Sequence, residues 1–424
     1  MSEDIKRIEF TEEMRKTYKI LLPNMLNLHF EILQGAFLGL GYNVELLTTD
    51  GRDIVDEGLK YVHNDTCYPA LLVIGQFITA LKSGKYDPDR TALMLTQTGG
   101  GCRASNYIHL LRKALVKAGF PQVPVISFNP SGLEKNSGFR ITLSMILLAM
   151  AGVIYGDALT AFANQARPYE TEQGATDALL QKWIGYLAER LKNGKDYSFG
   201  AIKRNLKRIG ADFDALALKP EKRVRVGVVG EIYVKYSPLA NNHLEEFLHS
   251  EGCEVNVPGL LGFIQYIFDN NVEDVALYGG KKVVKLVNLG LRRFLELYES
   301  MLRKALTASG KYRAPLPHKK VREWGRKTIG LGCKMGEGWL LTAEMAALCE
   351  EGYHNIVCVQ PFGCLPNHIV GKGMIRSLRE RFPNANIVAV DYDPGATRVN
   401  QENRIKLMLS VAREELTEDE LLPV

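Results

Sequence analysis

The 424-residue chain lacks the signature motifs of several large enzyme classes. It has no GxxxxGK(S/T) phosphate-binding loop, no HExxH zinc motif and no GxSxG nucleophile elbow. The glycine-rich stretch at 330–338 does not fit the GxGxxG spacing of dinucleotide-binding loops. The chain is therefore not expected to hydrolyse ATP at a Walker-type site, or to act as a zinc protease or a serine hydrolase.

The chain also has no large excess of positive or negative charge. The chain holds 53 Lys and Arg against 48 Asp and Glu, a formal net charge of +5, and these charges are evenly scattered. Proteins that bind nucleic acid or anionic membranes concentrate a larger positive excess on one face. We therefore expect neither nucleic acid nor a membrane surface among the partners.

Long hydrophobic runs are also missing. The longest, at 141–155, contains Thr142 and Ser144 and falls short of the roughly 18–20 apolar residues needed to cross a bilayer. The N-terminal MSEDIKRIEF has no apolar core of the kind found in signal peptides. The sequence therefore predicts a soluble, cytoplasmic protein in which the apolar run forms a buried helix.

The chain has few cysteines, and their number is odd. Seven cysteines occur, at positions 67, 102, 253, 333, 349, 358 and 364. An odd set in a long chain without an export signal argues against a disulfide framework. Metal binding, redox chemistry and simple burial remain open at this point.

Strand and helix signals alternate in the N-terminal third. Strands are expected at 18–22, 43–47, 91–95 and 123–127, and helices at 26–40, 69–81 and 105–118. This alternation is typical of a parallel sheet with helices on both faces.

The remainder is first helical and then alternating again. Helices are expected at 139–162 and 175–191, then strands beginning at 223 and spanning 254–257, 356–359 and 387–390, with helices at 242–250, at 281–308 and starting near 337 and 368. The sequence therefore predicts an α/β protein with two Rossmann- or flavodoxin-like parallel-sheet domains, 1–137 and 223–424. A helical segment, 138–222, separates them.

Three of the cysteines share one local context. Cys67 stands between a turn-forming NDT and a proline that begins a helix; Cys102 follows three glycines after a strand; Cys364 follows Phe-Gly after another strand. Each lies in a loop that enters a predicted helix. Because ligands of open α/β sheets gather outside the carboxyl ends of the strands, we interpret the three as one site between the two sheet domains.

The chemistry of such loops suits an anionic sulfur site. Free N–H groups and the positive end of a helix dipole are expected to lower the pKa of a cysteine thiol there. Glycine at 99–101 and 363 lets backbone N–H groups approach sulfides closely. Thiolates in such a nest suit a [4Fe–4S] cluster, although the cysteines are too far apart in the chain to match a local zinc or ferredoxin motif.

The sequence allows several roles for the other four cysteines and for two histidines. Cys253, Cys349 and Cys358 fall in strand or helix patterns typical of a core. Cys333, in the glycine-rich GLGCKMGEG, is the one candidate for a fourth ligand. His63 and His368 lie near the proposed site as ligands, proton donors or capping residues.

Five stretches resemble one known family. They are HNDTCYPALLVIGQFITAL, TQTGGGCRASNYIHLLRKAL, GEIYVKYSPLANN, GEGWLLTAEM and QPFGCLPNHIVGKGMIRSLRERFPNANIVAVDYDPGATRVNQENR. Together they are similar to the 2-hydroxyacyl-CoA dehydratase superfamily, to which double-cubane-cluster reductases belong. The strongest likeness is to the C-terminal, cluster-binding region of acyl-CoA dehydratase activase-type proteins, over about residues 15–415.

The resemblance implies a cofactor and partners. Its cysteine pattern falls on Cys67, Cys102 and Cys364, which would hold a [4Fe–4S] cluster with one iron left open. It implies a separate ATP-hydrolysing activator that delivers low-potential electrons, an acyl-CoA or other small substrate, a dimer, and anaerobic metabolism. A double cubane needs about twice as many cysteine ligands as the one motif set found here.

Three functions are consistent with these expectations. The first is a dehydratase or reductase component that carries out radical dehydration or reduction at the open iron. The second is a non-catalytic electron-transfer subunit or scaffold, favoured if Cys333 completes the ligand set. The third is a zinc-stabilised or cluster-free protein that binds a small molecule.

Overall fold

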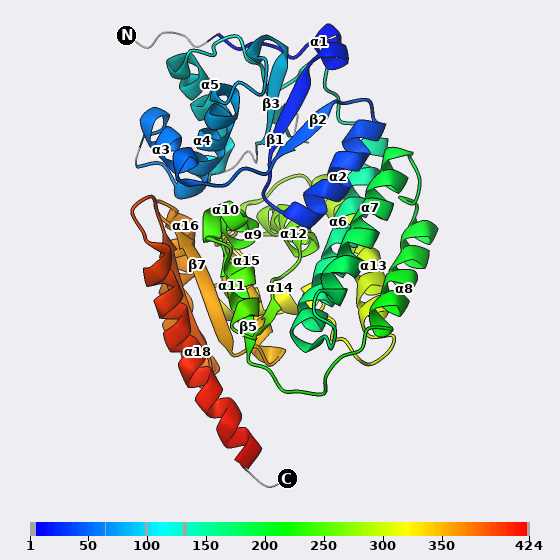
Figure 1. The fold of residues 1–424 in the computed structure, drawn as a ribbon, viewed down its shortest axis with the longest axis vertical. Coiled ribbons are helices and arrows are strands. Elements are labelled where there is room, and N and C mark those ends of the chain that lie inside the picture. The colour runs from blue at the N-terminus through cyan, green and yellow to red at the C-terminus, as the bar shows by residue number, and fades with distance from the viewer. Residues whose placement is uncertain (1–5, 64, 98–100, 130–133, 422–424) are drawn as a thin grey trace.

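The structure is a computed structural model that describes residues 6–63, 65–97, 101–129 and 134–421. Two parallel sheets and a layer of long helices make up the protein (Figure 1). The first sheet lies at the top of the view, the second at the lower left, and the long helices at the right. The predicted α/β class, with two Rossmann- or flavodoxin-like parallel sheets, is confirmed.

The first sheet has the strand order β2-β1-β3-β4, all parallel. Its strands are β1 (Lys19–Pro23), β2 (Val44–Leu47), β3 (Thr91–Thr96) and β4 (Val125–Phe128). Its helices are α1 (Glu12–Thr17), α2 (Asn27–Gly39), α3 (Arg52–Tyr61), α4 (Tyr68–Lys82) and α5 (Tyr107–Ala118). The strand order reverses between β1 and β3, because β2 is added on one side of β1 and β3 on the other; this switch point is where flavodoxin-like sheets bind ligands.

The second sheet repeats this order as β6-β5-β7-β8. Its strands are β5 (Arg225–Gly230), β6 (Glu254–Asn256), β7 (Asn355–Pro361) and β8 (Asn386–Tyr392), again all parallel. Every residue of β7 after the first is buried, as a central strand covered on both faces requires. The equivalent reversal point lies between β5 and β7.

The helical layer has its own apolar core. It contains α6 (Leu143–Ala166), α7 (Ala175–Lys192), α8 (Phe199–Asp214), α12 (Leu260–Tyr278) and α13 (Lys282–Leu306). Helix α2 joins it through close backbone contact with α7, since a Cβ on Gly35 would lie 2.3 Å from the carbonyl oxygen of Ala188. The helical core therefore draws on α2, α12 and α13, which lie outside the 138–222 segment.

The remaining elements are short, apart from α14, α15 and α18. They are α9 (Ile232–Tyr236), α10 (Pro238–Asn241), α11 (Leu244–Ser250), α14 (His318–Thr328), α15 (Trp339–Glu350), α16 (Leu365–Val370), α17 (Ile375–Arg381), α18 (Arg398–Leu421), and the 3-10 turns η1 (Pro88–Arg90), η2 (Arg103–Asn106), η3 (Arg167–Tyr169) and η4 (Lys372–Met374). Helix α18 runs along the outside of the second sheet to the C-terminus (Figure 1).

Helix α6 is a core helix. Together with η3 it is the one helix, among the described residues, that is long and apolar enough to cross a membrane. However, 67% of its most apolar 18-residue window is buried inside the protein. The run at 141–155 is therefore part of a longer helix than its length suggests, and the expected burial is confirmed.

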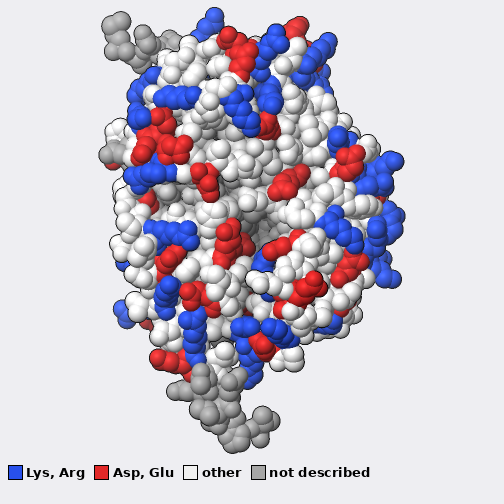
Figure 2. Space-filling view, in the orientation of Figure 1, with Lys and Arg blue, Asp and Glu red and all other residues white. Residues whose placement is uncertain are grey.

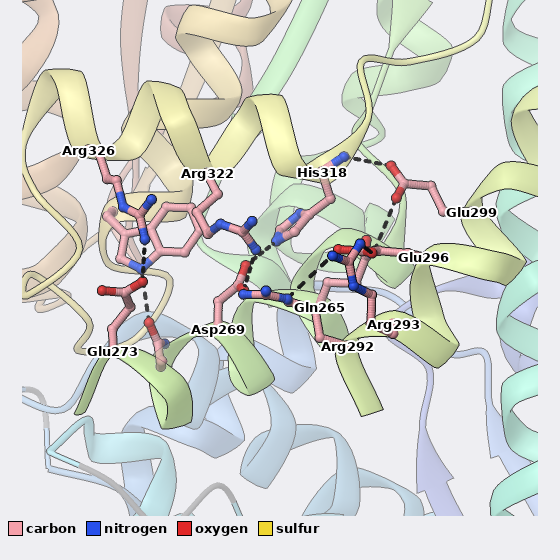
Figure 3. Close-up of polar contacts among 12 residues, drawn as sticks. Gln265, Asp269, Glu273, Arg292, Arg293, Glu296, Glu299, His318, Arg322 and Arg326 are labelled. Carbon is pink, nitrogen blue, oxygen red and sulfur yellow. Dashed lines mark hydrogen bonds and ion pairs between the residues drawn. The ribbon is translucent and has the colours of Figure 1, made fainter. Parts of the chain in front are cut away.

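A buried ionic network joins α12, α13 and α14 (Figure 3). The carboxylate of Asp269, which is fully buried, accepts hydrogen bonds from His318 at 2.8 Å and from Arg322 at 2.7 Å. Arg292 of α13 donates to the same carboxylate at 3.3 Å. Burial raises the pKa of Asp269, but the hydrogen bonds from His318 and Arg322 outweigh it and hold the pKa below its usual range, so the carboxylate is ionised at neutral pH.

Candidate functional site

Cys67, Cys102 and Cys364 are each the residue immediately before a helical segment. They occupy the N-cap positions of α4, η2 and α16, with extended backbone conformations. None of the three side chains accepts a capping hydrogen bond from its own helix. The prediction that each cysteine lies in a loop that enters a helix is therefore confirmed.

The loops that carry Cys67 and Cys364 are in direct contact, although they belong to different sheets. The N–H of Tyr68 donates to the carbonyl oxygen of Phe362 at 3.0 Å. A Cβ placed on Gly363, whose φ is +73°, would lie 3.2 Å from the Cα of Cys67. Glycine is needed at 363 both for this conformation and for this close approach.

A third loop brings Cys102 to the same place. Residues 330–338, which include the GEGW motif, pack against both Cys102 and α16. A Cβ on Gly336 would lie 3.4 Å from the Cβ of Pro366 and 4.0 Å from the sulfur of Cys102. The sulfur of Met335 lies against Gly101. Two of the three expected glycines beside Cys102, at 99 and 100, fall outside the described residues.

Two glutamates lie among these loops, Glu337 buried and Glu231 partly buried. Glu231 follows β5 and accepts the N–H of Val234 at 2.9 Å, which caps α9. Glu337 accepts the N–H of Ile232 at 3.0 Å and the side-chain amide of Asn367 at 2.9 Å. Glu337 therefore ties the loop after β5 to α16.

Two of the cysteine sulfurs have a polar neighbour. The hydroxyl of Tyr107, on α5, lies 2.8 Å from the sulfur of Cys67. The amide nitrogen of Asn367 lies 3.4 Å from the sulfur of Cys364 and donates to Glu337 as well. Each group can donate a hydrogen bond to a thiolate, and Glu337 fixes the orientation of the second.

The expected lowering of the thiol pKa values is wrong for the protein as the structure describes it. Burial raises the pKa of Cys67 to about 11 and also raises the pKa values of Cys102 and Cys364. The carboxyl group of Glu231 raises all three pKa values further, and that of Glu337 raises those of Cys102 and Cys364. Hydrogen bonds from backbone N–H groups and from neighbouring side chains lower the three values, but by less than burial raises them. Loss of hydration therefore outweighs the stabilisation of the thiolate that was expected from the helix N-termini, even for Cys67 at the start of the 15-residue α4.

The other cysteines and the two histidines considered in the sequence differ in burial. Cys253, Cys349 and Cys358 are buried, as expected for core residues. Cys333 is exposed, in the loop that covers Cys102. The ring nitrogen Nδ1 of His63 accepts the N–H of Asp65, and 72% of its side chain is exposed. His368 is half-buried on α16.

Burial also raises the pKa values of the two glutamate carboxyls. The charge of Glu337 raises the pKa of Glu231 further, while hydrogen bonds from Ile232 and Asn367 lower that of Glu337. Tyr107, Glu231, Glu337 and Asn367 were not among the residues that sequence reasoning selected. All four lie inside the stretches that carry the family resemblance, which was the available signal.

The three cysteine sulfurs and their surroundings are of the type that binds an iron–sulfur cluster. Cys67 and Cys364 are only 6% and 8% exposed, and glycines with positive φ lie beside both the Cys67 and Cys102 loops. Among the described residues, no group of three or more His, Cys, Asp or Glu side chains is arranged to hold a single metal ion. A cluster differs from one ion because its cysteines bind different irons and so lie farther apart.

Comparison with known proteins adds no relative. No family model matches the chain, and no curated protein matches it. Fold and site together define a two-sheet α/β protein whose three N-cap cysteines lie in loops gathered around Glu231 and Glu337.

Proposed function

We propose that the protein binds a [4Fe–4S] cluster through Cys67, Cys102 and Cys364 and acts as an iron–sulfur component of the 2-hydroxyacyl-CoA dehydratase type. The observation that carries this proposal is the gathering of three N-cap cysteine loops from both sheets. Tyr68 and Phe362 join the loops of Cys67 and Cys364, and the loop at 330–338 contacts both Cys102 and α16. Three thiols from separate elements match the ligand set of a cluster with one iron left open to a small ligand.

The protein's own residues would prepare this site. Tyr107 and Asn367 are placed to donate hydrogen bonds to two of the ligand sulfurs. Burial of Cys67 and Cys364 excludes water from them. When bound, the cluster would supply single electrons for radical dehydration or reduction of a small substrate, an acyl-CoA among the candidates.

The proposal includes a separate partner. A low-potential electron must be supplied from outside, because the chain has no Walker-type loop of its own. We propose an ATP-hydrolysing activator that docks near the cysteine loops, a dimeric assembly and a cytoplasmic location.

A second candidate function is that of an electron carrier. It is favoured by the loop at 330–338, because this loop carries Cys333 and packs against Cys102, with a Cβ on Gly336 lying 4.0 Å from the sulfur of Cys102. The hydroxyl of Tyr266 donates to the carbonyl oxygens of Lys334 and Gly336, which fixes this loop. If Cys333 were the fourth ligand, no iron would be open to substrate.

Anaerobic purification tests the proposal. We expect a brown protein with about four irons and four acid-labile sulfides per chain. An EPR spectrum that changes on addition of cyanide or a small thiol would indicate an open iron, and an unchanged spectrum would favour the carrier. A colourless protein that contains zinc, or no metal, would contradict both candidates.

A further inference from the structure

Helix α13 has two apolar faces, and only one of them is buried. Leu295, Tyr298 and Leu302 lie in the core of the helical layer. A second set of apolar residues on the same helix is 39–70% exposed, and its members are Val283, Leu286, Val287, Phe294 and Leu297. Because an α-helix repeats its face about every 3.6 residues, these five form one stripe that lies beside the buried face and is open to solvent.

The apolar surface continues at the tip of the hairpin that joins α12 to α13. Leu277 and Tyr278, which end α12, are 54% and 70% exposed. Since a large apolar residue carries roughly 150–250 Å², the stripe and the tip together leave on the order of 700 Å² open to solvent. The largest apolar patch of a typical monomer is roughly 300–600 Å², whereas each partner of a standard-size complex buries about 800 Å². This surface therefore has the size of an interface.

The stripe is symmetric about Gly290. Val283 and Leu297 lie seven residues before and after this glycine. Leu286 and Phe294 lie four residues before and after it. A two-fold axis through Gly290 would place each residue of a pair opposite the other residue of that pair in a second, antiparallel copy. Such a face is complementary to itself, as the interface of a symmetric dimer requires.

Nothing within the chain explains the glycine at 290. Glycine is unfavourable in the interior of a helix, and a Cβ placed on Gly290 would meet no atom within 4 Å. On a two-fold axis, however, the same residue of both copies meets its counterpart, and a side chain there would keep the two helices apart. The glycine is therefore placed where close approach of a second helix requires it.

The charges of α13 favour the antiparallel arrangement. Lys281 and Lys285 stand at its start, and its two acidic residues, Glu296 and Glu299, lie in its second half. The same axis places Lys281 opposite the Glu299 position of the second copy, and Lys285 beside the Glu296 position, so that opposite charges approach. Parallel packing would instead bring the lysines of both copies together. Over the face drawn in Figure 2, by contrast, Lys and Arg are interspersed with Asp and Glu, so charge there indicates no orientation for a partner.

We propose that α13 and the tip of the α12–α13 hairpin form the interface of a homodimer, in which two copies of α13 pack antiparallel about Gly290. The occupant of this face is a second copy of the chain, because the area, the symmetry and the charges of the face all match one. The inference deepens the dimeric assembly proposed above by naming its surface, and it rests on that part of the proposed function and not on the cluster.

Size-exclusion chromatography with light scattering, on the full chain purified anaerobically, tests the interface. We expect a mass about twice the 47.4 kDa of the chain. The double variant Leu286→Glu and Phe294→Glu should be a monomer with the far-ultraviolet circular dichroism of the wild type. The matched double variant Leu407→Glu and Val411→Glu, which charges two exposed apolar residues of α18, should remain a dimer.

Mixed variants test the antiparallel orientation. Val283→Lys and Leu297→Glu should each weaken self-association, and the two proteins should form a mixed dimer when combined, because Lys and Glu then face each other. Val283→Lys combined with Val283→Glu should not form one, since position 283 meets itself only in a parallel pair. A mixed dimer from the second combination and not from the first would overturn the proposed packing.

The interface and the cluster can fail separately. Cys67→Ser, which removes a proposed ligand of the cluster, should remain a dimer. A monomeric wild type, or equal dissociation of the two double variants, would overturn the proposal whether or not iron is bound. Binding of a monomeric wild type to vesicles that contain anionic lipid, lost in Leu286→Glu with Phe294→Glu, would assign the face to a membrane surface instead.

Discussion

Tyr107 and Asn367 each place a hydrogen-bond donor beside one of the proposed ligand sulfurs. Such donors stabilise negative charge on the sulfur and thereby raise the reduction potential of a bound cluster. The two contacts differ, because Tyr107 lies at 2.8 Å and Asn367 at 3.4 Å, where it is shared with Glu337. Tyr107 is therefore expected to have the larger effect on the reduction potential of a bound cluster.

Tyr107→Phe removes one hydroxyl and keeps the ring. We expect the fold and iron content to be retained and the reduction potential to fall by about 40 mV. That figure is the one-electron equivalent of a hydrogen bond of about 1 kcal/mol. A redox titration followed by EPR measures it. Tyr86→Phe, in the same sheet domain, is the control, and an equal potential in wild type and Tyr107→Phe would contradict this role.

The site could be predicted from sequence only in part. The cysteines were accessible because a turn between a strand or helix and a following helix is a local pattern. Glu231 and Glu337 were not, because their importance depends on which loops pack together. The thiol pKa values were misjudged for the same reason, since burial is a property of the tertiary structure.

At the scale of elements, Asp269 holds α12, α13 and α14 together (Figure 3). Its carboxylate is the shared acceptor for His318, Arg322 and Arg292. Arg322 is itself buried, so loss of this carboxylate would leave its charge uncompensated in the interior.

Asp269→Asn is expected to lower the free energy of unfolding by about 3–5 kcal/mol, the usual effect of breaking a buried ion pair from one side. Denaturant unfolding monitored by circular dichroism measures it. Glu273→Gln, which removes the partner of the exposed Arg326, should cost less than about 1 kcal/mol. A similar decrease in the free energy of unfolding in the two variants would show that the buried network stabilises the fold no more than an exposed ion pair does.

All eight expected strands are present, with ends within three residues of those predicted. They were predictable because short apolar runs bounded by turn residues are typical of buried parallel strands. Helix α12 was not predicted, since apolar residues surround its first turns and give no single face. Helix α18 was also missed, although Ile405, Met408, Leu409 and Ala412 have helical spacing and are buried.

At the scale of the whole molecule, the two sheets use the same strand order and meet through the cysteine loops. The fold class followed from the β–α alternation of the sequence. The participation of α2, α12 and α13 in one helical core did not, because it depends on contacts between segments more than 100 residues apart, such as α2 with α7.

The partner requirement is also a property of the whole molecule. Added negative charge at the site would be poorly solvated, since Cys67, Cys364 and Glu337 are buried there. We therefore expect dithionite alone to leave the protein incompletely reduced, and an activator with ATP to complete the reduction. EPR measures both states. Full reduction and full turnover with dithionite alone would remove the need for an ATP-driven partner.

Iron content of four single variants tests the central claim most directly. Cys67→Ser, Cys102→Ser and Cys364→Ser, purified anaerobically, should each lose most of the iron and sulfide found in the wild type. Cys253→Ser, a buried cysteine of the second sheet domain that lies outside the site, should retain both. Undiminished iron in any of the first three, or equal loss in all four, would contradict the assignment of the cluster to this site.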